Sequence, residues 1–132
     1  MKLYLDSSAV VKLVQREAES DALRRFLRRQ RSDQLVTSTL ARVEVVRAIR
    51  PGGGRAVSQA RRQLARLSQI VVSVELLDRA ADLAPDVLLR SLDAIHLASA
   101  ELAGDDLRAV VTYDHRMGDA ARALGLSVES PG

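Results

Sequence analysis

The chain has 132 residues, which suits a single domain over residues 1–132, since domains most often run to about 100–150 residues. Hydrophobic types make up 47% and charged types 28%, so the chain can bury a core and is unlike the apolar-poor chains that stay disordered. The absence of cysteine excludes disulfide scaffolds, thiolate metal sites and cysteine nucleophiles. With two Tyr, one Phe and no Trp, the composition also argues against an aromatic platform for stacking bases.

The net charge of +3 is unevenly distributed along the chain. Residues 1–66 carry 15 basic and 6 acidic side chains, a formal +9, whereas residues 67–132 carry 5 and 11, a formal −6. Eighteen of the 20 basic residues are Arg, whose planar guanidinium binds phosphate in a bidentate manner. This favours a polyanionic partner, although a codon preference for Arg over Lys explains the composition as well.

The amino-terminal segment does not read as a targeting signal. Asp6 interrupts the apolar stretch that a signal peptide needs, and no run approaches the roughly 18 apolar residues of a membrane helix. We therefore expect a cytoplasmic protein with no membrane segment.

Apolar periodicity predicts strands and helices in alternation along the chain. The predicted order is strand 2–5, helix 9–14, helix 17–31, strand 34–38, helix 39–49, helix 55–67, strand 70–73, helix 75–83, helix 92–102, strand 108–112, helix 117–124 and strand 127–129. A flexible connector is expected at the glycine run 52–54, and Ser7 or Ser8 is expected to cap the first helix. Strands alternating with helices predict an α/β fold whose parallel sheet is covered on both faces.

Two of these helices are rich in arginine. Arginines gather toward the end of the helix predicted over 17–31 and around the helix predicted over 55–67. They fit a solvated amphipathic helix and also a surface that contacts RNA, with Arg24, Arg28, Arg61 and Arg62 as the first residues to test.

Four acidic residues stand in positions that suggest a shared site. Asp6 and Asp114 follow predicted strands, and the carboxyl ends of parallel strands are where open α/β sheets bind ligands. Glu44 and Asp93 lie within otherwise apolar helices, where a carboxylate is costly to bury without compensation. Carboxylates crowded together repel one another unless a hard cation such as Mg²⁺ or Mn²⁺ neutralises them. The other interpretation is that these residues only cap helices.

Four segments in order resemble the PIN domain, and in particular the VapC ribonuclease toxins of bacterial toxin and antitoxin pairs. They are Leu5-Asp6-Ser7-Ser8-Ala9, Thr39-Leu40-Ala41-Arg42-Val43-Glu44-Val45, Leu92-Asp93-Ala94-Ile95-His96-Leu97-Ala98 and Val111-Thr112-Tyr113-Asp114. The resemblance runs from residue 3 to about 128. It implies a three-layer α/β/α sandwich with a mainly parallel sheet, Mg²⁺-dependent endoribonuclease activity in which Mn²⁺ can substitute, inhibition by a cognate antitoxin, and a homodimer.

The same resemblance assigns residues to the expected site. Asp6, Glu44, Asp93 and Asp114 match the family's catalytic and metal-binding acids, with Asp6 and Asp93 as the most direct ligands. Ser7 and Thr112 match hydroxyl positions beside the site, where they could orient a ligand or a water, or else cap a helix.

Three further residues have two interpretations each. Arg116 is a candidate contact for an RNA phosphate or an exposed surface residue. His96 follows Asp93 by three residues and could hydrogen-bond to it, as a general base or, in the favoured interpretation, as a structural residue. Asp119 could extend the acidic cluster, but an exposed position early in its helix is favoured.

The sequence thus predicts an endoribonuclease that uses a metal-activated water, and two alternatives remain. A phosphohydrolase with an aspartyl nucleophile would typically carry a second Asp two residues after the first, where this chain has Ser8. A non-catalytic RNA- or partner-binding module would use the carboxylates only as helix caps.

Overall fold

Five parallel strands form the central sheet of the computed structural model, which describes all 132 residues. The strand order is β3-β2-β1-β4-β5. In chain order the elements are β1 (Lys2–Leu5), α1 (Ser7–Val14), α2 (Ser20–Arg29), β2 (Gln34–Ser38), α3 (Ala41–Ile49), α4 (Gly54–Ala65), β3 (Ser68–Ile70), α5 (Val74–Asp82), α6 (Ser91–Glu101), β4 (Leu107–Val111), α7 (His115–Ala123) and β5 (Val128–Glu129).

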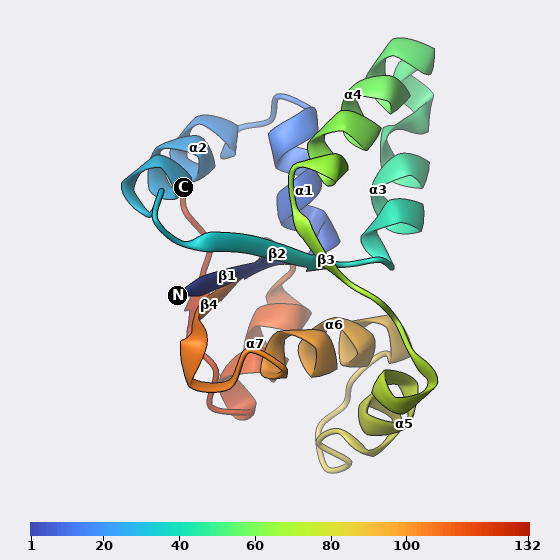
Figure 1. Ribbon diagram of the computed structural model, residues 1–132, viewed down its shortest axis with the longest axis vertical. Helices are drawn as coiled ribbons and strands as arrows, with labels where there is room; N and C mark the ends of the chain where they lie inside the picture. Colours follow the sequence, from blue (N-terminus) through green and yellow to red (C-terminus); the bar gives the residue numbers. More distant parts are fainter.

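Helices cover both faces of this sheet. Helices α1 to α4 lie on one face and α5 to α7 on the other (Figure 1). The predicted three-layer α/β/α sandwich with a parallel sheet is therefore confirmed.

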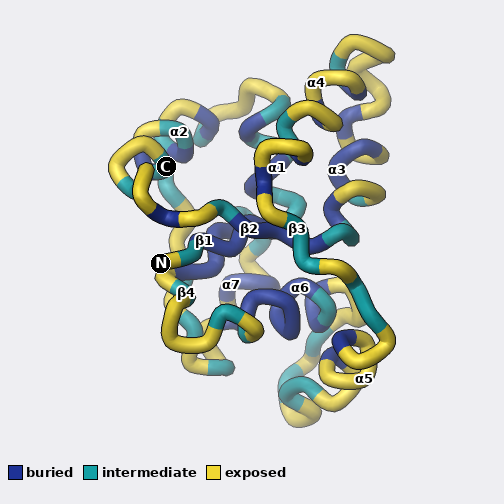
Figure 2. The backbone as a smooth tube through the Cα atoms, viewed as in Figure 1, coloured by how far each residue is buried: buried dark blue, intermediate teal, exposed yellow.

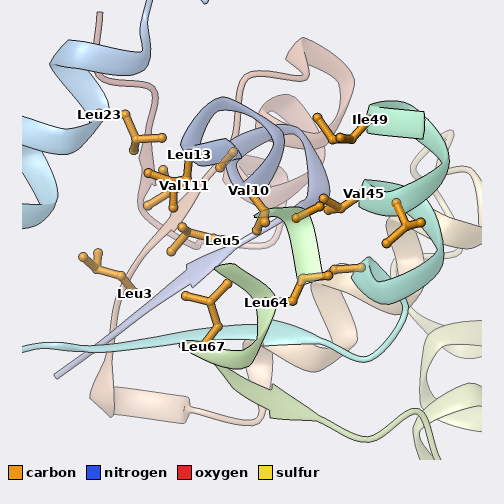
Figure 3. Close-up of a cluster of buried hydrophobic side chains, with 14 of the residues drawn as sticks. Leu3, Leu5, Val10, Leu13, Leu23, Val45, Ile49, Leu64, Leu67 and Val111 are labelled. Atoms are coloured by element: carbon orange, nitrogen blue, oxygen red, sulfur yellow. The ribbon is translucent and has the colours of Figure 1, made fainter. Parts of the chain in front are cut away.

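The core follows from the alternation of side chains along the central strands. Leu3 and Leu5 of β1 belong to the larger cluster under α1 to α4 (Figure 3). Tyr4 points to the opposite face and packs with Val110 of β4. Because helices cover both faces, the last three residues of β1, β2 and β4 are all buried (Figure 2). Leu3, Leu5 and Val110 are all 0% exposed.

Two local predictions are wrong. The strand predicted over 70–73 spans Ser68–Ile70 instead, because it pairs with Val36 to Ser38 of β2. The glycine run is a tight turn rather than a flexible connector: a 3₁₀ turn over Arg50–Gly52 leads directly into α4. Gly53 adopts a φ of 94°, a conformation that side chains with a Cβ rarely take.

The strand order brings the carboxyl ends of β1 and β4 together. After β3 the chain crosses to the other side of β1, so β1 and β4 are neighbours that come from distant parts of the sequence. Leu5 is paired with Val111, which brings the residues after both strands to the same place. Such a reversal of strand order opens a crevice at the carboxyl ends, and Asp6 and Thr112 lie there.

A transmembrane segment is not among the helices. None of them combines the length and the apolar character that crossing a membrane requires.

Candidate active site

One cleft of about 270 Å³ brings the four predicted carboxylates together from four separate segments. Its lining is mostly polar and contains only two hydrophobic residues. The lining residues are Asp6, Ser7, Ser8, Glu44, Arg90, Ser91, Leu92, Asp93, His96, Asp114 and Met117. The predicted convergence of Asp6, Glu44, Asp93 and Asp114 is therefore present in the structure.

Asp6 is the most deeply buried of the four, with 3% of its surface exposed. Its carboxylate accepts hydrogen bonds from Ser8 Oγ at 2.6 Å, Thr112 Oγ1 at 2.5 Å and the Ala9 backbone N–H at 3.1 Å. Burial raises the pKa of Asp6 above its ordinary value, and the three hydrogen bonds only partly oppose this. The helix cap predicted at Ser7 or Ser8 is in fact Asp6, since its side chain receives the Ala9 N–H.

Glu44 is held by hydrogen-bond partners that extend into the core. Ser7 Oγ donates to Glu44 Oε1 at 2.6 Å, and His96 Nε2 lies 2.7 Å from the same oxygen. On its other side, His96 Nδ1 lies 2.7 Å from the buried Tyr4 hydroxyl. Burial acts to raise the pKa of Glu44, but the contacts with His96 and Ser7 bring it below its ordinary value.

These contacts decide the position of His96. Its side chain is only 3% exposed, and its partners are Tyr4, Glu44 and Ser7. The predicted hydrogen bond from His96 to Asp93 is therefore wrong: α3 approaches α6 so that Glu44, and not the residue one turn earlier, meets the ring. The structural interpretation of His96 is supported, because the residue links the core to a cleft carboxylate.

Asp93 and Asp114 share one cationic partner, Arg90. Arg90 Nε lies 2.8 Å from Asp93 Oδ2, and Arg90 Nη2 lies 2.8 Å from Asp114 Oδ2. Asp114 also caps α7 by accepting the backbone N–H of Arg116 at 2.9 Å. Burial acts to raise the pKa of Asp114, but the backbone donors of α7 and the guanidinium of Arg90 bring it below its ordinary value.

The donor set of the cleft suits a hard divalent cation in its chemistry. It consists of carboxylate and hydroxyl oxygens, the ligand type that Mg²⁺ prefers. Burial raises the pKa of Asp6, and a bound cation would offset the free-energy cost of keeping this buried carboxylate ionised. In the present conformation, however, no three acidic or histidine side chains converge closely enough to hold an ion, and Arg90 is the cation that neutralises two of them.

Comparison with known proteins identifies the family. The model of the PIN domain matches residues 3–123. Ribonuclease VapC46 of Mycobacterium tuberculosis is 52% identical over 129 residues, with 98% of this chain and 97% of the relative covered. The chain belongs to the PIN-domain family and, within it, to the VapC ribonucleases.

Other VapC proteins extend the comparison. Ribonuclease VapC35 of Mycobacterium tuberculosis is 44% identical over 132 residues, with 98% of this chain and 97% of the relative covered. The crystal structure of Mycobacterium tuberculosis VapC20, a sarcin-ricin-loop-cleaving toxin, has a TM-score of 0.76 at 19% identity and covers 98% of this chain and 99% of that chain. A toxin-antitoxin complex from Klebsiella pneumoniae has a TM-score of 0.73, also at 19% identity, with 98% of each chain covered. At 19% identity, these solved structures show a similarity of fold alone.

Within this PIN domain, the two predicted hydroxyl residues differ in position. Ser7 lines the cleft and donates to Glu44. Thr112 is 1% exposed and is not among the lining residues, so its role as a substrate-binding residue stays a prediction. Its hydroxyl donates to Asp6 and accepts the Asp114 backbone N–H at 3.1 Å, which makes it a positioning residue for both acids.

Two other candidates lie outside the cleft lining. Arg116 is exposed on the first turn of α7, where its role as a phosphate contact stays a prediction. Asp119 has 82% of its side chain exposed and its Oδ1 lies 3.6 Å from Arg122 Nη1, so the favoured interpretation as a surface residue is confirmed.

The arginines of α2 do not surround the carboxylates. Helix α2 ends at Arg29 and leads to the start of β2, so its last turn lies toward the amino ends of the strands, whereas the cleft lies at the carboxyl ends. Arg25, Arg28, Arg29 and Arg31 line an exposed hollow there together with Ser32. Arg24 is different, because its Nη2 donates to the Leu13 carbonyl at 2.7 Å and so binds the end of α1.

Sequence reasoning missed Arg90 and Tyr4 as residues of the site. Arg90 precedes Asp93 by three residues, and opposite charges at that spacing are a usable signal. Its second contact, with Asp114, depends on how α7 is placed against α6. Tyr4 lies between two leucines, and nothing in the sequence around it indicates a contact with His96.

Proposed function

We propose that this PIN domain hydrolyses RNA phosphodiester bonds with water activated at the cleft formed by Asp6, Glu44, Asp93 and Asp114, and that it requires Mg²⁺, for which Mn²⁺ can substitute. The observation that carries the proposal is the convergence of these four carboxylates, from four segments, at the carboxyl ends of β1 and β4. The family membership and the oxygen donors of the cleft support it. A divalent ion bound there would lower the pKa of a water molecule and stabilise the developing negative charge on a phosphate.

The chain's own residues would prepare the site for that ion. Asp6 is fixed by Ser8, Thr112 and the start of α1, so it can present its carboxylate without rearrangement. Glu44 is oriented by Ser7 and His96, and its lowered pKa keeps it ionised at neutral pH. Ordered carboxylates of this kind reduce the entropic cost of assembling a catalytic geometry.

The direct test compares RNA cleavage by the purified chain in Mg²⁺, in Mn²⁺ and in chelator. We expect cleavage with either ion, none in chelator, and a loss of at least 100-fold in Asp93→Asn. Asp78→Asn is the matched control, because Asp78 is an exposed acid on α5 that lines no part of the cleft. Equal rates for Asp93→Asn and Asp78→Asn would contradict the proposed mechanism.

The same assay addresses the two alternatives. RNA binding that needs no divalent ion, with no cleavage of any RNA tested, would favour a non-catalytic RNA- or partner-binding module. A trapped phosphoryl group on Asp6 would favour the aspartyl phosphohydrolase. The Asp6 side chain is buried, and each of its carboxylate oxygens already accepts a hydrogen bond, which argues against Asp6 as a nucleophile.

We also propose a cognate protein antitoxin and a homodimer. The Klebsiella pneumoniae complex and the Rickettsia felis VapBC2 structure, with a TM-score of 0.72, support an antitoxin partner.

The homodimer is supported by exposed apolar side chains on α5 and in the segments before and after it: Val71, Val74, Leu77, Leu88 and Leu92 are between 43% and 104% exposed. They support self-association of two copies. Light scattering of the purified chain would give the mass of a dimer, and a monomeric mass would contradict this part. The cytoplasmic location stays a prediction.

A further inference from the structure

Arg90 stands where electrostatics alone disfavours a cation. It is the residue immediately before α6, and its guanidinium reaches Asp114, which caps the start of α7. Helix starts carry partial positive charge, so a cation near two of them is unfavourable unless anions compensate it. The compensating anions are Asp93 and Asp114, each 2.8 Å from one guanidinium nitrogen. The position of Arg90 is therefore explained by the two carboxylates and not by capping.

The contact uses the two carboxylates that would otherwise be open to a ligand. Asp6 and Glu44 are held by groups of the protein other than Arg90, namely hydroxyls, a backbone amide and the His96 ring. Asp93 and Asp114 depend on the guanidinium for neutralisation on the cleft side. In the same arrangement, no three acidic or histidine side chains converge closely enough to hold an ion.

We propose that Arg90 is a built-in counter-ion that competes with the divalent cation, so that metal binding requires the guanidinium to leave Asp93 and Asp114. This inference rests on the proposed function, because it concerns the ion of the same site. The exchange is favourable in charge, since two carboxylates with one guanidinium carry a net −1, whereas two carboxylates with a divalent cation are neutral. The all-oxygen donors of both residues suit the incoming ion.

Exposure makes the exchange feasible. The Arg90 side chain is 54% exposed and that of Asp114 is 34% exposed, so solvent screens their contact, whereas the side chain of Asp93 is only 11% exposed. Exposed ion pairs of this kind are weak, because water competes for both partners and the long side chain loses entropy in one geometry. The guanidinium can therefore turn outward to the mouth of the cleft without a change of backbone.

The test measures Mn²⁺ affinity of the full chain by calorimetry in four proteins. We expect Arg90→Gln to bind Mn²⁺ about tenfold more tightly than the unsubstituted chain, because the competitor is removed. Arg90→Lys keeps the charge but cannot reach both carboxylates with one planar fork, so its affinity should lie within threefold of Arg90→Gln. Arg79→Gln, which removes an exposed arginine of α5, is the matched control and should leave affinity unchanged. Circular dichroism of each protein would establish that it is folded.

Other results would overturn the inference. Unchanged or weaker Mn²⁺ binding in Arg90→Gln would do so, and so would an Arg90→Lys affinity equal to that of the unsubstituted chain, which would indicate long-range charge and not competition. Failure of all four proteins to bind Mn²⁺ would defeat the proposed function itself, and this inference with it. Mn²⁺ binding that is equal in all four would defeat the inference alone.

A spectroscopic readout provides an independent check. Titration with Mg²⁺ should move the Arg90 Nε–H nuclear magnetic resonance signal to the position of a solvated guanidinium, because its hydrogen bond to Asp93 is lost. A signal that stays in place after Mg²⁺ has saturated the site would show that the guanidinium does not leave, and would overturn the inference.

Discussion

Replacing Asp6 with asparagine should stabilise the metal-free protein while it abolishes activity. The pKa of Asp6 is raised because burial penalises the ionised form more than its hydrogen bonds favour it. A folded protein that raises the pKa of an acid loses stability as pH rises through that folded pKa. The asparagine side chain has the same shape without the charge, and it can still accept from Ser8 and the Ala9 N–H.

The size of the effect follows from the contacts of Asp6. Burial of an ionised carboxylate costs several kcal/mol. Three hydrogen bonds to the charged carboxylate offset much of that cost, at roughly 1.5–3 kcal/mol each, whereas asparagine keeps the two from Ser8 and the Ala9 N–H at roughly 0.5–1.5 kcal/mol each. Since burial still dominates, we expect Asp6→Asn to raise the free energy of unfolding by about 1–2 kcal/mol at pH 7. For a chain of this length, that is an increase of about 3–8 °C in Tm.

Thermal unfolding in chelator, followed by circular dichroism, measures this effect. The difference in Tm should close as pH falls toward 3.8, the ordinary pKa of an aspartate, because Asp6 is then protonated in both states. Mg²⁺ should raise the Tm of the unsubstituted chain and leave that of Asp6→Asn unchanged. Asp78→Asn is the control, since it removes an exposed charge. A lower Tm for Asp6→Asn in chelator at pH 7 would refute the reasoning.

Three further predictions concern the supports of the site and the basic surface. Tyr4→Phe should lower the free energy of unfolding by about 1–2 kcal/mol, because it leaves His96 Nδ1 without its buried partner; chemical denaturation would measure this, and an unchanged midpoint would contradict it. Asp33→Asn should destabilise the protein only at pH above the lowered pKa of Asp33, since contact with Arg108 keeps that carboxylate ionised. The unsubstituted chain should lose this stability as pH falls through the same pKa, and equal melting curves of the two proteins at pH 7 would count against the prediction. Arg28→Gln should weaken RNA binding modestly and reduce its salt dependence, as measured by fluorescence anisotropy at several salt concentrations, whereas an identical slope would exclude Arg28 from the interface.

Much of the fold could be predicted because local signals agreed with one another. The strands β1 and β4 each end in a buried apolar run of three residues, and the acids that follow these runs had to lie at the same edge once the sheet was parallel. Glu44 and Asp93 were identifiable because ionised side chains are rare on apolar helix faces. The strand β3 was misplaced by two residues, since its register is set by pairing with β2 and its own residues are only partly buried.

The contacts within the site could not be predicted, because they depend on how distant segments approach. Sequence spacing placed His96 beside Asp93, yet the approach of α3 put Glu44 within 2.7 Å of His96 Nε2. Thr112 has a hydroxyl group that could bind a ligand, and only the structure shows that this residue is buried and that its hydroxyl donates to Asp6. Arg90 reaches Asp114 across 24 positions of sequence, which no periodicity records.

The four carboxylates divide into two kinds by the partners that hold them, and this division bears on how an ion would enter. Asp6 and Glu44 are oriented by groups of the protein that stay in place when a cation arrives, because hydroxyls and amides donate to a carboxylate whether or not it also binds metal. Asp93 and Asp114 are held by Arg90, a group that a cation repels. A bound ion would therefore gain Asp93 and Asp114 as ligands only as the guanidinium leaves. Coordination by Asp93 and Asp114 is then coupled to the release of the Arg90 guanidinium from both carboxylates.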